Sequence, residues 1–174
     1  MKWIRNTIVG KNFSFSAWGW LWLRLFVWSG WKAIFWVGDE KFTILGLELF
    51  YPAKKVAVIL SGIDPHVKTI LSYHLSFDFA FMAGVYPGIT ALCMMARYKK
   101  NSSAIKNILL IVAFLQIIAW GCDIIENCFL LKWIHTPEIG TEFTFYHLVV
   151  ITKWGLAFFG AFLAIPMLLI SKRK

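Results

Sequence analysis

Four long stretches with few charged residues restrict what this chain can fold into more than any other feature. They cover approximately residues 15–37, 74–96, 105–131 and 145–170. Each stretch reaches the roughly 20 apolar residues that an α-helix needs to cross the hydrocarbon core of a bilayer. Soluble domains contain about 45–50% apolar residues, whereas 59% of this chain is hydrophobic. The sequence therefore predicts a membrane protein with four helical spans.

The connections between the spans predict how these helices are arranged. Two of them are short, which favours antiparallel neighbours. We therefore expect an all-α integral membrane fold, an antiparallel four-transmembrane-helix bundle that forms a single domain over residues 1–174. The longer connection, residues 38–73, is predicted to form short extracytoplasmic helices, one of which begins after Pro52 and ends at Gly62. Asp64, which a proline follows, is a typical N-cap of a helix that continues into the second span.

Two glycines in the second span carry a prediction about packing. Gly84 and Gly88 are spaced as GxxxG, and glycine lets the backbones of two membrane helices approach closely. We expect a neighbouring helix to pack against this face.

The distribution of charge predicts the orientation in the membrane. The net charge is +9, and lysines and arginines gather before the first span, between the second and third, and at the C-terminus, without any acidic residue in these segments. Because cytoplasmic loops carry such an excess of basic residues, we expect both chain ends to lie in the cytoplasm of a multi-pass protein of the bacterial inner (plasma) membrane. The basic segments would then contact anionic lipids, and nucleic-acid binding is not expected.

Acidic and polar residues inside the second and third spans are the best indication of a functional site. Asp123, Glu126 and Asn127 follow the spacing i, i+3, i+4, which places them on one helical face. His74 and Asp78 lie one turn apart in the second span. A charge at the bilayer centre costs about 2.5–3.5 kcal/mol on insertion scales, so such groups face the bundle interior or a wet cavity. With this orientation, we expect them to meet near the outer leaflet.

The predicted roles follow from the chemistry of these groups. A pair of carboxylates can act as acid and base, and a lysine can hold a phosphate or an oxyanion. The residues that we expect to be catalytic are Asp123, Glu126 and, across the helix interface, Asp78. The residues that we expect to contact a ligand are Lys32, Asn127, His74, His147, Lys153 and Tyr86.

We predict no metal site, because the sequence contains no HExxH or comparable spacing and nearby lysines would compete with a metal cation for the carboxylates. Haem between His74 and His147 is disfavoured by the three acids beside them, and the sequence assigns no other cofactor.

Two classes of function remain open. In the first, the protein binds or modifies a lipid or another amphiphile at the polar site, and the sequence does not decide whether a reaction is catalysed. In the second, it is a non-enzymatic accessory or scaffold subunit of a larger membrane complex, or of a homo-oligomer, and the charges hold helices together. The expected partners are membrane lipids in the first class and membrane proteins in the second.

The segment from Phe50 to Leu131 resembles a group of small bacterial four-span membrane proteins that has no assigned activity. In that group an extracytoplasmic helical segment centred on a tyrosine leads into a span with an aspartate followed by Phe or Tyr and a proline, and the next span contains D-x-x-E-N. The matching residues here are Tyr51, Asp78, Tyr86, Pro87, Asp123, Glu126 and Asn127. The resemblance implies a four-span fold and the position of a site, and it implies no reaction.

Overall fold

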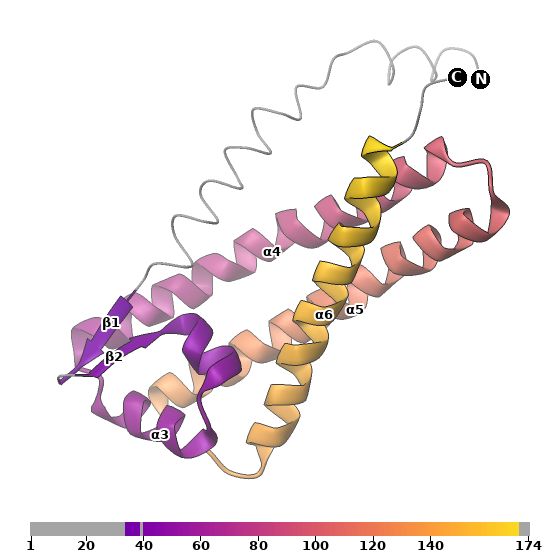
Figure 1. Ribbon diagram of the computed structural model, residues 1–174. Coiled ribbons are helices and arrows are strands. Elements are labelled where there is room, and N and C mark those ends of the chain that lie inside the picture. The colour runs from indigo at the N-terminus through magenta and orange to yellow at the C-terminus, as the bar shows by residue number, and fades with distance from the viewer. Residues whose placement is uncertain (1–33, 39, 171–174) are drawn as a thin grey trace.

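Three long apolar helices dominate the computed structural model, which describes residues 34–38 and 40–170 (Figure 1). They are α4 (Pro65–Lys99), α5 (Ser103–His135) and α6 (Glu142–Leu169), and each is long and apolar enough to cross a membrane. The prediction of a mainly helical chain is confirmed, and the second, third and fourth predicted spans are helices able to cross a membrane.

The predicted first span, residues 15–37, is not described by the structure before residue 34. Its last four residues form a strand and not the end of a helix, so this predicted boundary is wrong. Lys32, a predicted site residue, also lies outside the described residues.

The three helices pack against one another in an arrangement that the sequence largely determines. Helices α4 and α5 run side by side in opposite directions, and α6 packs against both (Figure 1). Helix α4 starts where predicted, because the Asp64 carboxylate accepts hydrogen bonds from the backbone N–H groups of His66 and Val67 at 2.8 and 2.9 Å, and a proline occupies the first helical position. This cap satisfies two of the backbone donors that every helix start leaves unpaired.

The residues between the predicted first and second spans form what we call the cap segment, residues 34–38 and 40–63. It contains the strands β1 (Ile34–Val37) and β2 (Glu40–Thr43), one π-helical turn η1 (Gly46–Phe50) and the helix α3 (Ala53–Gly62). The predicted short helix after Pro52 is therefore present, and it buries Val56, Ile59 and Leu60.

The hairpin and the π-helical turn were not predicted from the sequence. Strands β1 and β2 pair antiparallel with Val37 opposite Glu40. Gly38 adopts a φ of 58° in the turn, a conformation that glycine adopts without steric cost.

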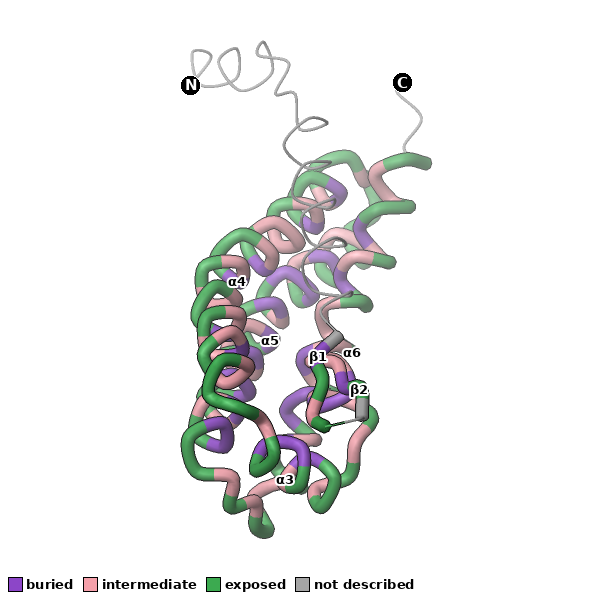
Figure 2. Tube along the Cα trace, turned by 90° about the vertical axis from the view of Figure 1, so that its left-hand side faces the viewer, coloured by how far each residue is buried: buried purple, intermediate pink, exposed green. Residues whose placement is uncertain are grey.

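The cap segment and the adjoining helix ends share one apolar core. Phe42 and Leu47 of the cap segment join Leu71 of α4, Trp133 of α5 and Tyr146 of α6 in a single buried cluster. Figure 2 shows buried segments mainly on the sides of the elements that face each other, while the outer sides of α4, α5 and α6 are largely exposed. Many of the exposed side chains on these helices are large and apolar, as expected of surfaces that face acyl chains. The cap segment is thus packed firmly onto one end of the three-helix unit.

The close helix contact occurs at a different glycine from the predicted pair. A Cβ atom added at Gly84 or Gly88 would meet no described atom within 4 Å, so none of the described helices packs closely against the predicted GxxxG face. At Gly160 of α6, a Cβ atom would lie 2.6 Å from Nε2 of Gln116 and 2.9 Å from Cγ2 of Ile89. At Gly160, helix α6 therefore lies directly against side chains of α4 and α5.

Candidate functional site

The ammonium group of Lys153 lies at the centre of a buried polar cluster between the three helices. Lys153 is 6% exposed. Its Nζ atom is 2.6 Å from Oε2 of Glu126 and 3.0 Å from Oδ1 of Asp123, both on α5. It is also 3.8 Å from Oε2 of Glu48, which belongs to η1 in the cap segment. A single cation thus connects α5, α6 and the cap segment.

Two hydrogen bonds connect α4 to the same cluster. The hydroxyl group of Tyr86 donates to Oδ2 of Asp123 at 2.7 Å. The side-chain amide of Asn127 donates to Oδ2 of Asp78, also at 2.7 Å. Hydrogen bonds to charged groups are roughly twice as strong as neutral ones, so both contacts fix the orientation of a carboxylate.

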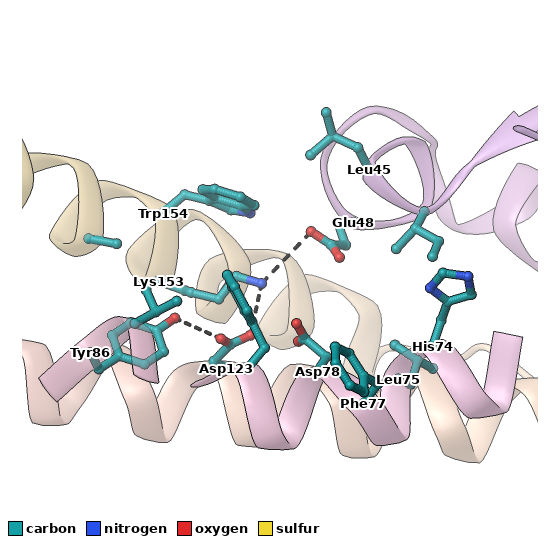
Figure 3. Close-up of a pocket in the computed structure, with 14 residues that line it drawn as sticks. Leu45, Glu48, His74, Leu75, Phe77, Asp78, Tyr86, Asp123, Lys153 and Trp154 are labelled. Atoms are coloured by element: carbon teal, nitrogen blue, oxygen red, sulfur yellow. Dashed lines mark hydrogen bonds and ion pairs between the residues drawn. The ribbon is translucent and has the colours of Figure 1, made fainter. Parts of the chain in front are cut away.

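A cavity of about 180 Å³ lies beside this cluster, between α4, α6 and the start of η1 (Figure 3). The carboxylates of Glu48, Asp78 and Asp123 and the side chain of Lys153 contribute to its lining. Its remaining lining is mainly apolar and aromatic, and it includes Phe77, which is 65% exposed. Because Phe77 belongs both to the lining and to the outer surface of α4, the cavity reaches the surface of the protein.

The charges at the site do not balance among the described residues. Four carboxylates (Glu48, Asp78, Asp123 and Glu126) surround one ammonium group. Burial raises the pKa of Glu48, Lys153 opposes this shift, and the neighbouring charges of Asp78 and Asp123 raise the pKa further. The carboxyl group of Glu48 therefore binds a proton more readily than an exposed glutamate does.

The structure brings seven of the nine predicted site residues together. Asp78, Asp123, Lys153, Tyr86 and His74 line the cavity, and Asn127 and Glu126 lie next to it in the cluster.

Glu126 is 0% exposed and does not line the cavity, and its Oε1 atom has no hydrogen-bond partner among the described residues. A ligand in the cavity can therefore contact the carboxylates of Glu48, Asp78 and Asp123, but not that of Glu126. His147 does not join the site, because its ring stacks on Phe143 with centroids 6.2 Å apart.

Two residues of the site, Glu48 and Trp154, were not predicted from the sequence. Glu48 belongs to the connection between the first two predicted spans, and it lines the cavity and faces Lys153. A signal was available, because Glu48 is the one acid in the apolar run from Phe42 to Phe50. Trp154, next to Lys153, has its ring centroid 5.1 Å from the ammonium group.

No group of three or more histidine, cysteine, aspartate or glutamate side chains in the described part of the chain is arranged to hold a metal ion. Chemically, the arrangement offers hydrogen-bond acceptors and negative charge at the end of an apolar cavity.

Comparisons with known proteins add no further constraint. No protein-family model, curated protein or solved structure matches this chain.

Proposed function

We propose that this protein binds the polar group of a lipid or another amphiphile in the cavity between α4, α6 and η1. The observation that carries this proposal is a cavity that reaches the surface and in which carboxylates and an apolar wall meet. Ligand sites in proteins are concave and mostly apolar, with a few placed polar groups. Ionisable residues within membrane helices also mark functional sites by default.

The orientation predicted from the sequence would place this cavity near the outer leaflet of the inner membrane. The short basic loop between α4 and α5 lies at the end of these helices opposite the cap segment (Figure 1). Basic loops favour the cytoplasmic side, so the cap segment and the cavity would lie on the extracytoplasmic side. A lipid could then enter past Phe77 from the bilayer.

A structural role is the second candidate, and the polar contacts themselves support it. Lys153 joins α6 to α5, while Tyr86 and Asp78 join α4 to α5. Such interhelical contacts stabilise membrane proteins by about 0.6 kcal/mol on average. A scaffold subunit needs these contacts, but it does not need a cavity beside them.

Filling the cavity separates the two candidates. Ala157 lines the cavity, so Ala157→Phe would occupy its volume, and Val85→Phe would do so from α4. The matched control is Ala83→Phe, since Ala83 is exposed and does not line the cavity. Native mass spectrometry of the protein purified in a mild non-ionic detergent would detect a ligand that copurifies.

We expect a bound amphiphile on the wild-type protein and on the control, and its loss from both cavity-filling variants. Size-exclusion chromatography would show whether each variant remains folded and monodisperse. If the wild-type protein carries no ligand and none can be added, or if the filled variants keep it, ligand binding in this cavity is refuted.

A further inference from the structure

We infer that the polar group bound in the cavity is a cation, an amine or quaternary ammonium group held by Asp78 and Glu48. This inference rests on the proposed function, because it names the chemical class of the ligand for the same cavity. Three observations carry it: the excess of carboxylates, the aromatic lining, and the size and position of the cavity.

The ammonium group of Lys153 is already paired with two other carboxylates. Lys153 forms its shortest contacts with Glu126 and Asp123, at 2.6 and 3.0 Å. Lys153 is the one cation paired with Glu126 among the described residues, and the other oxygen of Glu126 is buried without a hydrogen-bond partner. Moving the ammonium group away would therefore leave a fully buried carboxylate unpaired, which costs several kcal/mol.

The negative charges of the two remaining carboxylates, Asp78 and Glu48, are only weakly compensated by their neighbours. Asp78 accepts one hydrogen bond, from the neutral amide of Asn127, among the described residues. Glu48 lies 3.8 Å from Lys153, the longest of the three ion pairs of that lysine. Both carboxylates line the cavity and point toward it in Figure 3. A positive ligand placed between them would supply the missing charge, whereas an anionic group would be repelled.

The apolar lining suits an ammonium group better than a hydrated metal ion. Aromatic rings of Trp154, Tyr86, Phe77 and Phe81 line the cavity. The face of an aromatic ring attracts cations, and rings of this kind bind quaternary ammonium groups. Because methyl or methylene groups on the nitrogen are apolar, they can pack against the same rings.

The volume of the cavity selects a head group and not a whole lipid. A cavity of about 150 Å³ binds benzene, so a cavity of about 180 Å³ accepts a trimethylammonium or ethylamine group. The exposed ring of Phe77 marks the side on which attached chains would leave toward the bilayer. The ligand can be a free amine or the head group of a lipid, since both present the same chemistry.

Two pairs of probes test the charge of the ligand and its source. The first pair is choline and its uncharged isostere, in which a carbon atom replaces the nitrogen, titrated calorimetrically into the full-length protein in a non-ionic detergent. The second pair is phosphatidylethanolamine and phosphatidylglycerol with identical acyl chains, compared by native mass spectrometry. Choline binding indicates that a free ammonium group is sufficient. Preference for phosphatidylethanolamine without choline binding indicates that the lipid provides the ammonium group.

The variant Asp78→Asn keeps the shape of the side chain and removes its charge. We expect its affinity for the cationic probe to fall about tenfold or more, because the neutral amide no longer attracts the positive charge of the ammonium group; a tenfold loss corresponds to about 1.4 kcal/mol. Binding of the isostere should not change. Glu48→Gln should act in the same way if Asp78→Asn fails to fold. Glu138→Gln is the control, since Glu138 is exposed in the loop after α5 and does not line the cavity.

The outcomes separate this inference from the proposed function. If the isostere or phosphatidylglycerol binds as well as its cationic partner, the cavity binds amphiphiles but the assignment of a cation is overturned. An unchanged affinity of both carboxylate variants would overturn it as well. If none of the four probes binds and no ligand copurifies, the proposed function itself fails.

Discussion

Replacing Lys153 by methionine should show how strongly the buried ion pairs hold the three helices together. Methionine has a similar length and leaves no large void, so the main change is the loss of the ammonium group. That group lies 2.6 Å from Glu126 and 3.0 Å from Asp123, and all three residues are buried. Removing one partner of a buried ion pair costs about 3–5 kcal/mol, because the other charge remains uncompensated. We expect the free energy of unfolding to fall by this amount.

Lys132→Met is the matched control for this substitution. Lys132 pairs with Glu142 at 3.7 Å, but the two side chains are 58% and 31% exposed, and surface ion pairs contribute about 0–1 kcal/mol. Unfolding of both variants can be followed by circular dichroism as a denaturing detergent is titrated into the same mixed micelles. Adding Glu126→Gln to Lys153→Met should recover part of the lost stability, since the unpaired carboxylate is then gone. Equal losses in the two lysine variants, or no recovery in the double variant, would refute this reasoning.

Three further predictions test single features of the structure. Tyr86→Phe removes the hydrogen bond to Asp123, so the free energy of unfolding should fall by about 0.6–1.7 kcal/mol in the same detergent titration; an unchanged value would contradict the geometry of this contact. Gly160→Ala places a Cβ atom 2.6 Å from the buried amide of Gln116 and should lower the free energy of unfolding by about 1–3 kcal/mol. Gly84→Ala is the control, because its Cβ atom meets no described atom within 4 Å, and it should not lower the free energy of unfolding. Because burial raises the pKa of Glu48 and the deprotonated carboxylate attracts a cation, the affinity for choline should rise with pH through that raised pKa. The calorimetric titration repeated over a pH series would show this rise in the wild-type protein and a weaker one in Glu48→Gln.

The long helices could be predicted because their signals are local. An apolar run that spans the bilayer, with a capping residue such as Asp64 before it, forms a helix in almost any arrangement of its neighbours. The same holds for α3, where the apolar residues recur at helical spacing between Pro52 and Gly62. These elements depend little on tertiary contacts.

The hairpin was missed because two local signals compete. The segment IFWVGDEKFT continues the apolar run of the predicted first span, which favours an extended helix. It also contains Gly-Asp at the point where two strands with a two-residue turn would meet, which is a typical hairpin signal. The structure follows the second signal, and the stacking of Phe35 on Phe42 at 5.4 Å stabilises the pairing.

The candidate site could be predicted in part, because helical spacing decides which residues share a face but not which helices meet there. Asp123, Glu126 and Asn127 lie together for this reason. His147 precedes Lys153 by six residues, about one and two-thirds turns, so the two side chains leave α6 in different directions. The position of Glu48 depends on how the cap segment folds onto α6, a long-range contact that no local pattern contains.

The pairing of Lys153 with acids of the preceding helix has a consequence for the biogenesis of the protein. Asp123 and Glu126 in α5 and Lys153 in α6 each oppose entry into hydrocarbon on their own, yet their helices are consecutive and joined by a short loop. Lys153 would compensate part of this negative charge if the two helices entered the membrane together as a hairpin. A nascent chain that ends before α6 presents two unpaired acids to the lipid, so α5 becomes a stable anchor after α6 has been synthesised.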